Sequence, residues 1–202
     1  IITFASTNHY MPLFLKKEEN NVLIYIWKIQ ESLEELVQLY PNLEFPKFKS
    51  KKRNLESICS RVLLYKYSKN LKISYSENGS PLLNNHQYIS ISHSGNLVCI
   101  AISDYKIGVD IDEISEKSKK TQSKFVNPNQ TNLTKNKTSL IWCIKESVYK
   151  FHKKGNVNFK RDILLQNFVP KSEGMLTVIF RKKNLKAYYF KIENKYLVYV
   201  CK

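Results

Sequence analysis

Three carboxylates and a lysine lie in two short segments whose spacing suits phosphate chemistry. Residues 107–112 read Ile-Gly-Val-Asp-Ile-Asp, so an extended strand would point Asp110 and Asp112 to one face. Glu146 precedes Lys150 by four positions, so a helix would place these two side chains together. Neighbouring carboxylates are stabilised by a cation, and Mg²⁺ prefers carboxylate, water and phosphate oxygens. The spacing leaves two interpretations open: a Mg²⁺ site, or a solvated strand end beside a surface ion pair.

The segments before residue 104 predict strands and helices that could position a second set of polar groups. Residues 22–27 are apolar and predict a buried strand, after a β-prone start at 1–6 and a loop through Pro12. Ser32 and Glu35 form the pattern of a capping box that starts a helix. A second helix is predicted after the basic cluster 47–53, with an apolar face made of these residues: Leu55, Ile58, Val62, Leu63 and Tyr67.

A histidine ends the next predicted strand. Residues 88–94 alternate, which puts Ile89, Ile91 and His93 on one face and the serines on the other. A polar strand end is the ordinary reason for such a histidine, and ligand binding is the alternative. Residues 97–102 predict the partner strand of a hairpin.

The second half of the chain repeats the strand-and-helix pattern without a legible sequence repeat. A helix with apolar residues from Leu140 to Phe151 is expected to end at Gly155. Antiparallel strands are then expected at 175–180, 187–192 and 196–201. Turns between them are predicted at these residues: Gly174, Asn184 and Asn194.

Composition limits the possible partners and compartment. The 202 residues include 33 Lys and Arg against 17 Asp and Glu, a formal net charge of +16 that predicts attraction to polyanions. The four cysteines form no Cys-x-x-Cys pair, which argues against a zinc site and favours a reduced, cytoplasmic protein. No apolar run is long enough for a membrane span, and no signal peptide is visible.

The two acidic segments together resemble a paired signature. Residues 107–112 resemble the Val-Gly-Val-Asp strand of the 4′-phosphopantetheinyl transferase superfamily. Residues 142–150, Trp-Cys-Ile-Lys-Glu-Ser-Val-Tyr-Lys, resemble its Trp-Ser-x-Lys-Glu-Ala-x-x-Lys helix. The pair is similar in particular to the two-subdomain, surfactin-synthetase-activating type. Asp112 departs from the Glu that larger members usually carry there. The connection between the two segments is also on the short side.

Three further blocks resemble the same superfamily. The helix that starts near Arg53 resembles an Arg-x-x-Glu-x-x-x-x-Arg helix that meets the 3′-phosphate end of coenzyme A. Its Arg61 is either a ligand or a structural residue, paired with Glu56 or packed beneath a loop. Residues 91–94 match an Ile-Ser-His-Ser block that contacts coenzyme A phosphates, whereas Ser80 replaces the usual Lys of a Gly-Lys-Pro loop.

The resemblance implies an α+β fold of two similar α/β subdomains, 1–103 and 104–202, about a pseudo-two-fold axis, with the active site in the cleft between them. The first would contact the coenzyme A phosphates and the second would hold metal and catalytic residues. The implied residues are as follows: catalytic Glu146, Lys150 and Asp110; cofactor-binding Arg53, Ser92, His93 and Lys150; metal-binding Asp110, Asp112 and Glu146. Lys145 would serve carrier docking or structure.

The implied reaction moves the 4′-phosphopantetheine arm of coenzyme A to a serine of an acyl or peptidyl carrier protein and releases adenosine 3′,5′-bisphosphate. Mg²⁺, or Mn²⁺, would be required, and the enzyme would be a monomer that binds an acidic carrier. The alternatives are a basic nucleic-acid-binding protein, which the basic cluster supports but no binding motif does, and a Mg²⁺-dependent phosphoesterase. A degenerate member that binds coenzyme A without transferring its arm is a further alternative.

Overall fold

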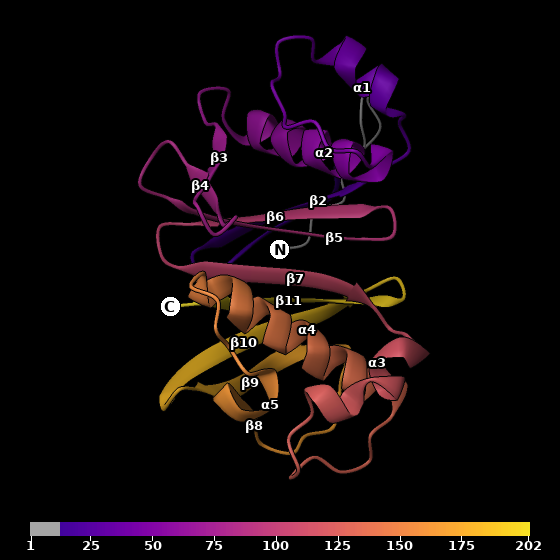
Figure 1. Ribbon diagram of the computed structural model, residues 1–202, viewed down its shortest axis with the longest axis vertical. Helices are drawn as coiled ribbons and strands as arrows, with labels where there is room; N and C mark the ends of the chain where they lie inside the picture. Colours follow the sequence, from indigo (N-terminus) through magenta and orange to yellow (C-terminus); the bar gives the residue numbers. More distant parts are fainter. Residues whose placement is uncertain (1–12) are drawn as a thin grey trace. The chain divides into compact units, whose positions relative to one another are not determined.

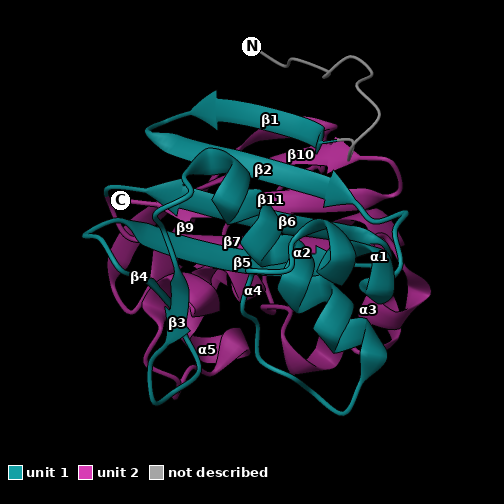
Figure 2. Ribbon diagram, turned by 90° about the horizontal axis from the view of Figure 1, so that it is seen from above, with its two compact units in different colours: residues 1–104 teal, residues 105–202 magenta. Residues whose placement is uncertain are grey.

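The computed structural model describes residues 13–202, which form two compact units that divide between Asp104 and Tyr105 (Figure 2). Each unit has an antiparallel sheet with one long helix packed on it, and every strand pairing in the described part is antiparallel. The predicted α+β class is therefore confirmed. The predicted β-prone start at residues 1–6 lies outside the described residues.

Unit 1 is built on a four-stranded sheet in the order β1-β2-β6-β5, and the pair β3-β4 forms a separate small sheet (Figure 1). Its elements are β1 (Leu13–Glu19), β2 (Val22–Lys28), α1 (Leu33–Leu39), α2 (Lys51–Tyr67), β3 (Ile73–Tyr75), β4 (Pro81–Leu83), β5 (Tyr88–Ser94) and β6 (Leu97–Ser103).

The core of unit 1 lies between α2 and this sheet. Ile58 and Val62 of α2 are fully buried against β-strand residues such as Ile89 and Ile100. The capping box at the start of α1 is present, since the Ser32 hydroxyl accepts from the Glu35 amide and the Glu35 carboxylate accepts from the Ser32 amide. Within the described residues, the elements of this half confirm the two predicted helices and the strands predicted at 22–27, 88–94 and 97–102.

Strand β1 was not predicted. Its sequence, Leu-Phe-Leu-Lys-Lys-Glu-Glu, has too few apolar residues to suggest a strand, and only Leu15 is buried. Pairing with the strongly apolar β2 supplies the hydrogen bonds that its own pattern does not predict. The chain turns between them at Asn20 and Asn21, both with positive φ.

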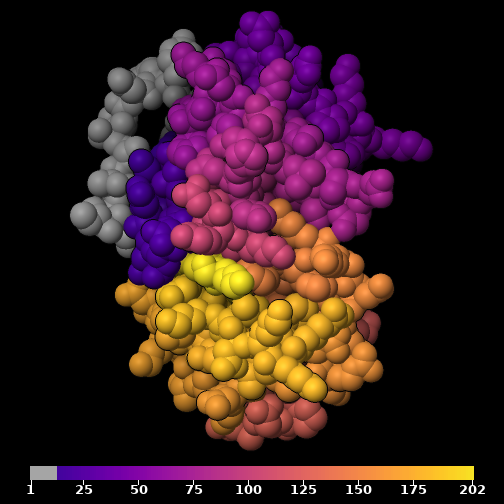
Figure 3. Space-filling model, turned by 90° about the vertical axis from the view of Figure 1, so that its left-hand side faces the viewer, coloured from indigo at the N-terminus to yellow at the C-terminus, as the bar shows by residue number. Residues whose placement is uncertain are grey.

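Unit 2 is built on a five-stranded sheet in the order β7-β11-β10-β9-β8. Its last strands, coloured gold to yellow, lie at the surface in the view of Figure 3. Its elements are β7 (Ile107–Glu113), α3 (Glu116–Lys120), the 3-10 turn η1 (Gln122–Lys124), α4 (Lys135–His152), α5 (Phe159–Asp162), β8 (Ile163–Leu165), β9 (Glu173–Phe180), β10 (Lys183–Ile192) and β11 (Lys195–Cys201).

Helix α4 packs along β7 and β11 and closes the core of unit 2 (Figure 1). Leu140, Ile141, Ile144 and Val148 are fully buried, as their helical spacing predicts. The helix ends before Gly155, because Lys153 already adopts a left-handed conformation as its C-terminal cap.

Two of the three predicted turns in the C-terminal strands are wrong. The chain reverses between β9 and β10 at Arg181 and Lys182, both with positive φ, whereas Asn184 lies inside β10 and Gly174 inside β9. Turns of this kind favour glycine or asparagine, so the composition gave no signal for an Arg-Lys pair.

The structure tests two predictions from composition, the burial of the cysteines and the lack of a membrane-spanning segment. All four cysteines are free thiols and three of them are buried, as expected for small apolar side chains. Within residues 13–202, no helix is long and apolar enough to cross a membrane.

Candidate active site

The contact between β7 and α4 depends on a glycine in the first acidic segment. A Cβ atom added at Gly108 would lie 2.1 Å from the carbonyl oxygen of Ser147 and 2.4 Å from the amide nitrogen of Phe151. Both atoms belong to the α4 backbone, so no side chain can move aside to make room. Gly108 therefore allows the helix backbone to approach the strand closely. The Ser147 hydroxyl adds a link to the sheet by donating to the Val198 carbonyl at 3.0 Å.

This close packing joins the strand and the helix through a partly buried ion pair. The Lys150 ammonium donates to the Asp110 carboxylate at 2.7 Å, and Asp110 is only 6% exposed. Hydrogen bonds between charged groups of this length are about twice as strong as neutral ones. The backbone of Asp110 is fixed as well, because the Cys143 thiol donates to its carbonyl at 3.3 Å. The structure thus brings together two predicted site residues that are 40 positions apart.

Glu146 shares the environment of this pair. Burial, together with the negative charges of Asp110 and Asp112 and against the lowering effect of Lys150, raises the pKa of Glu146 to about 7. The three predicted carboxylates therefore interact electrostatically. Asp112 is less buried than Asp110, and its carboxylate accepts from the Glu113 amide at 2.8 Å.

The fit of this cluster to a metal ion depends on its donor chemistry. Among residues 13–202, no three His, Cys, Asp or Glu side chains converge in a group that could hold an ion on their own. Mg²⁺ is usually held by one or two carboxylates completed by water and substrate phosphate oxygens, rather than by a complete protein cage. Asp110, Asp112 and Glu146 supply the donor type that Mg²⁺ prefers and interact electrostatically, but they do not form a complete cage by themselves.

Lys145 has a structural position, and the docking role predicted as an alternative for it is wrong. Its side chain is fully buried at 0% exposure, and burial lowers its pKa to about 7. The side-chain nitrogen donates to Asn127 Oδ1 at 3.1 Å and to the carbonyls of Phe159 and Ile163 at 2.6 Å and 2.7 Å. A group at this depth cannot meet a partner protein. It ties α4 to the segments around Asn127 and α5 instead.

Asn127 was not recognised from sequence. It lies in Asn-Pro-Asn, a pattern that predicts only a helix break. The structure gives it a second contact, because its amide donates to the Lys160 carbonyl. Lys145 lies inside the motif helix, directly before Glu146, and spacing alone does not distinguish a buried lysine from an exposed one. The contact between Lys145 and Asn127 therefore gave no signal in the sequence.

Trp142, the first residue of the helix motif, is an aromatic packing residue. Its ring lies 5.1 Å from that of Phe125 and 5.6 Å from that of Phe159, in tilted and edge-on arrangements. Such pairs stabilise beyond simple burial. The motif therefore combines structural residues, Trp142 and Lys145, with the charged residues Glu146 and Lys150.

In unit 1, His93 at the end of β5 meets a glutamate from α2. His93 Nδ1 lies 3.2 Å from Glu56 Oε1, and the Lys52 ammonium lies 3.8 Å from the same oxygen. The Glu56 oxygen makes no hydrogen bond within the described part of the chain, so these are ion-pair contacts without hydrogen-bond alignment. Glu56 is buried, whereas the His93 side chain is 51% exposed. Glu56 pairs with these residues and not with Arg61, which was one of its predicted partners.

The other predicted phosphate contacts of unit 1 are dispersed. Arg53 is exposed in the first turn of α2, with its guanidinium 4.6 Å from the centre of the Phe48 ring. Ser92 is buried on the face of β5 opposite His93. Arg53 therefore lies at the start of a helix and His93 near the end of a strand. No contact joins these two side chains among the interactions of the described residues.

Comparison with known proteins supports the class of protein that this strand–helix signature indicates, the 4′-phosphopantetheinyl transferases. No family model matches the chain. The chain is similar to the 4′-phosphopantetheinyl transferase gsp of Aneurinibacillus migulanus, with 28% identity over 127 residues. The match covers 55% of this chain and 54% of the relative, so the chain spans about half the length of the curated relative it matches. This similarity confirms the predicted resemblance to the superfamily.

Proposed function

We propose that this protein is a 4′-phosphopantetheinyl transferase, which moves the phosphopantetheine arm of coenzyme A to a serine hydroxyl of an acyl or peptidyl carrier protein. The observation that carries the proposal is the Asp110–Lys150 pair, held beside Glu146 on the two segments that resemble the superfamily signature. The similarity to the named transferase points to the same reaction. The second product is adenosine 3′,5′-bisphosphate.

Asp110, Asp112 and Glu146 would hold Mg²⁺, or Mn²⁺, in this proposal. The ion would supply a Lewis acid that neutralises charge on the pyrophosphate oxygens of coenzyme A. The buried position of Asp110 keeps its carboxylate in one orientation, fixed by Lys150 and by the backbone contact of Cys143. Preorganised charges of this kind need no rearrangement when the substrate binds.

Glu146 is the proposed proton acceptor, directly or through a water that it orients. The carrier serine must lose its proton as its oxygen bonds to phosphorus and the bond from phosphorus to the adenosine bisphosphate oxygen breaks. A pKa of about 7 suits this task, because a base works best when its pKa lies near the operating pH. Lys150 would stabilise the negative charge that develops on the phosphate oxygens and on the leaving group.

Unit 1 would bind the phosphates of coenzyme A through Arg53, Ser92 and His93. The half-exposed imidazole of His93 lies at the end of β5, where its surface is open to a ligand, and its Nδ1 lies 3.2 Å from Glu56 Oε1. We assign coenzyme A contacts to 1–103 and metal and catalytic residues to 104–202, and the pseudo-two-fold relation of the two parts stays a prediction. Monomeric state and cytoplasmic location also stay predictions.

The carrier protein is proposed to be acidic. A net charge of +16 would attract such a partner over a distance and would make the association rate fall as salt rises. A falling transfer rate with added salt at fixed Mg²⁺ would agree with this part of the proposal.

The proposal is tested by the intact mass of an apo carrier protein after incubation with this protein, coenzyme A and Mg²⁺. The expected result is a mass gain of one phosphopantetheine arm, lost when the metal is chelated and in Lys150→Gln. Lys135→Gln, an exposed lysine of the same helix, is the matched control and should keep the activity. No mass gain on several carriers, together with no coenzyme A binding, would contradict the proposal and direct the test to polyanion binding.

A further inference from the structure

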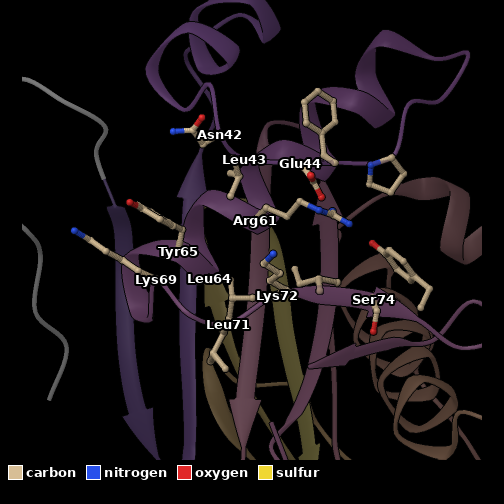
Figure 4. Close-up of a pocket in the computed structure, with 14 residues that line it drawn as sticks. Asn42, Leu43, Glu44, Arg61, Leu64, Tyr65, Lys69, Leu71, Lys72 and Ser74 are labelled. Carbon is tan, nitrogen blue, oxygen red and sulfur yellow. The ribbon is translucent and has the colours of Figure 1, made fainter. Parts of the chain in front are cut away.

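Unit 1 contains a cavity of about 550 Å³ that the proposed transfer reaction does not use. Its walls come from the loop between α1 and α2, the second half of α2, and the segment that leads into β3 (Figure 4). Arg53, Ser92 and His93, the proposed coenzyme A contacts, do not line it. A cavity of this size can hold a small organic molecule.

The cavity is lined by a buried arginine. Arg61 is 6% exposed, and its Nη1 donates to the carbonyl and hydroxyl oxygens of Ser57 at 3.1 Å and 2.9 Å. Figure 4 shows its guanidinium extending among the lining residues. Among residues 13–202, no carboxylate lies within ion-pair distance of this side chain; Glu56, its predicted partner, pairs with Lys52 and His93.

A guanidinium at this depth with only neutral partners is unfavourable, because burial removes water without supplying an opposite charge. The planar donor edge of arginine matches a carboxylate or a phosphate, which accept two parallel hydrogen bonds. Arg61 therefore has the burial and the unused charge that an anion-binding residue needs.

The other walls define the rest of the ligand. Leu64 and Leu71 are apolar, and the ring of Tyr75 lies 5.8 Å from the guanidinium carbon of Arg61. Lys72 and Glu44 are exposed lining residues, of which Lys72 adds positive charge and Glu44 adds one negative charge. A ligand with one anionic group and a flat apolar body satisfies these surfaces, since more negative charge would be repelled by Glu44.

We propose that this cavity is a binding site for a small organic anion, whose carboxylate or phosphate group pairs with Arg61 while its apolar body packs against Leu64 and Tyr75. The site belongs to unit 1 alone and is separate from the coenzyme A contacts.

Calorimetric titration of the full chain with benzoate and with phenyl phosphate tests this inference and distinguishes the two anionic groups. We expect one ligand per chain for at least one probe, with a Kd of about 1 mM for molecules of this size. Cyclohexanol, an uncharged apolar molecule, should not bind measurably. Saturating coenzyme A should leave probe binding unchanged.

Four variants locate the site. Arg61→Met should weaken probe binding by at least about tenfold, and a circular dichroism spectrum would check its fold. Lys72→Gln, an exposed change that leaves folding intact, should weaken it about twofold to fivefold, and Glu44→Gln should strengthen it by a similar factor. Lys51→Gln, an exposed lysine outside the cavity, is the control and should bind as the wild type does.

Three results would overturn the inference. If neither probe binds at concentrations up to about 10 mM, the cavity is not an anion site, because a complementary pocket reaches that affinity with few atoms. Wild-type binding in both Lys72→Gln and Glu44→Gln would place the probe elsewhere. Displacement of the probe by coenzyme A would assign the cavity to the coenzyme A site.

Discussion

The charged residues proposed to act in the transfer reaction differ between the two units in how deeply they are buried and paired. In unit 2, Asp110 is buried, pairs with Lys150 at 2.7 Å and lies on a strand that meets α4 through Gly108. In unit 1, His93 is half exposed at a strand end, and Arg53 lies in solvent on the first turn of α2.

Buried and exposed charges contribute differently to stability and to ligand binding. Buried charges are held in one geometry and interact strongly, but each must be paired or its desolvation destabilises the fold. Exposed charges contribute little to folding and can rearrange around a ligand. We therefore expect changes in the unit 2 cluster to alter both stability and chemistry, and changes to His93 or Arg53 to alter ligand affinity alone.

The largest effect is expected from closing the gap at the β7–α4 contact. Gly108→Ala would force its Cβ against the α4 backbone, and we expect the free energy of unfolding to fall by about 3 kcal/mol or more. Urea denaturation measures this change. The comparison in unit 1 is Gly79→Ala, which has nothing within 4 Å but a φ of +77°, and should lose only about 1 kcal/mol. Equal losses in the two variants would remove the steric explanation.

The next effect tests the buried lysine. Lys145→Met would leave three acceptors without their donor, so we expect a loss of about 2–3 kcal/mol in the free energy of unfolding. Lys135→Met, on the exposed start of the same helix, should change it by less than about 0.5 kcal/mol. A Lys145→Met protein as stable as the wild type would show that the three hydrogen bonds do not hold α4 in place.

Glu146 should give a pH-dependent effect on stability in the metal-free protein. Its pKa is raised from 4.5 to about 7, so the native state keeps a proton between these values that the unfolded state has released. The resulting stability is complete below about pH 4.5 and is lost as the pH rises through about 7.

Glu146→Gln removes this titration. Urea denaturation in the presence of a chelator should show the variant more stable than the wild type by about 1–2 kcal/mol at about pH 8. The difference should shrink as the pH is lowered toward 4.5. A difference that is independent of pH would mean that Glu146 is not under electrostatic stress in the native state.

The smallest effect on folding is expected in unit 1. His93→Ala should change the free energy of unfolding by less than about 1 kcal/mol, because Lys52 stays beside the buried Glu56 carboxylate, and should weaken coenzyme A binding about tenfold, measured by calorimetric titration. His86→Ala, another exposed histidine of unit 1, is the matched control and should change neither quantity. A marked loss of stability in His93→Ala would contradict the contrast between exposed and buried charges.

The sequence predicted which side chains share a face of a strand or helix, but not how deeply they are buried or which distant residues they contact. The alternation of residues 107–112 and the helical spacing of Glu146 and Lys150 predicted which of these charged side chains share a strand or helix face, because periodicity determines the face. Periodicity cannot show burial depth or a distant partner, so the Lys145 clamp to Asn127 and the Glu56–His93 contact had no signal. The sequence also could not show that Arg61 lacks a carboxylate partner among the described residues, because spacing does not reveal which residues surround a side chain in the fold.

The most direct test of the account is the rate of carrier modification by Asp110→Asn beside Asp104→Asn. Asp104 is exposed and accepts from Gln87, so its variant controls for the loss of one negative charge. We expect Asp110→Asn to lower the transfer rate by at least about 100-fold at saturating coenzyme A and Mg²⁺, and Asp104→Asn to change it by less than about twofold. A folded Asp110→Asn protein that transfers the arm within about tenfold of the wild-type rate would contradict the claim that Asp110 and the charged residues around it in unit 2 carry the chemistry.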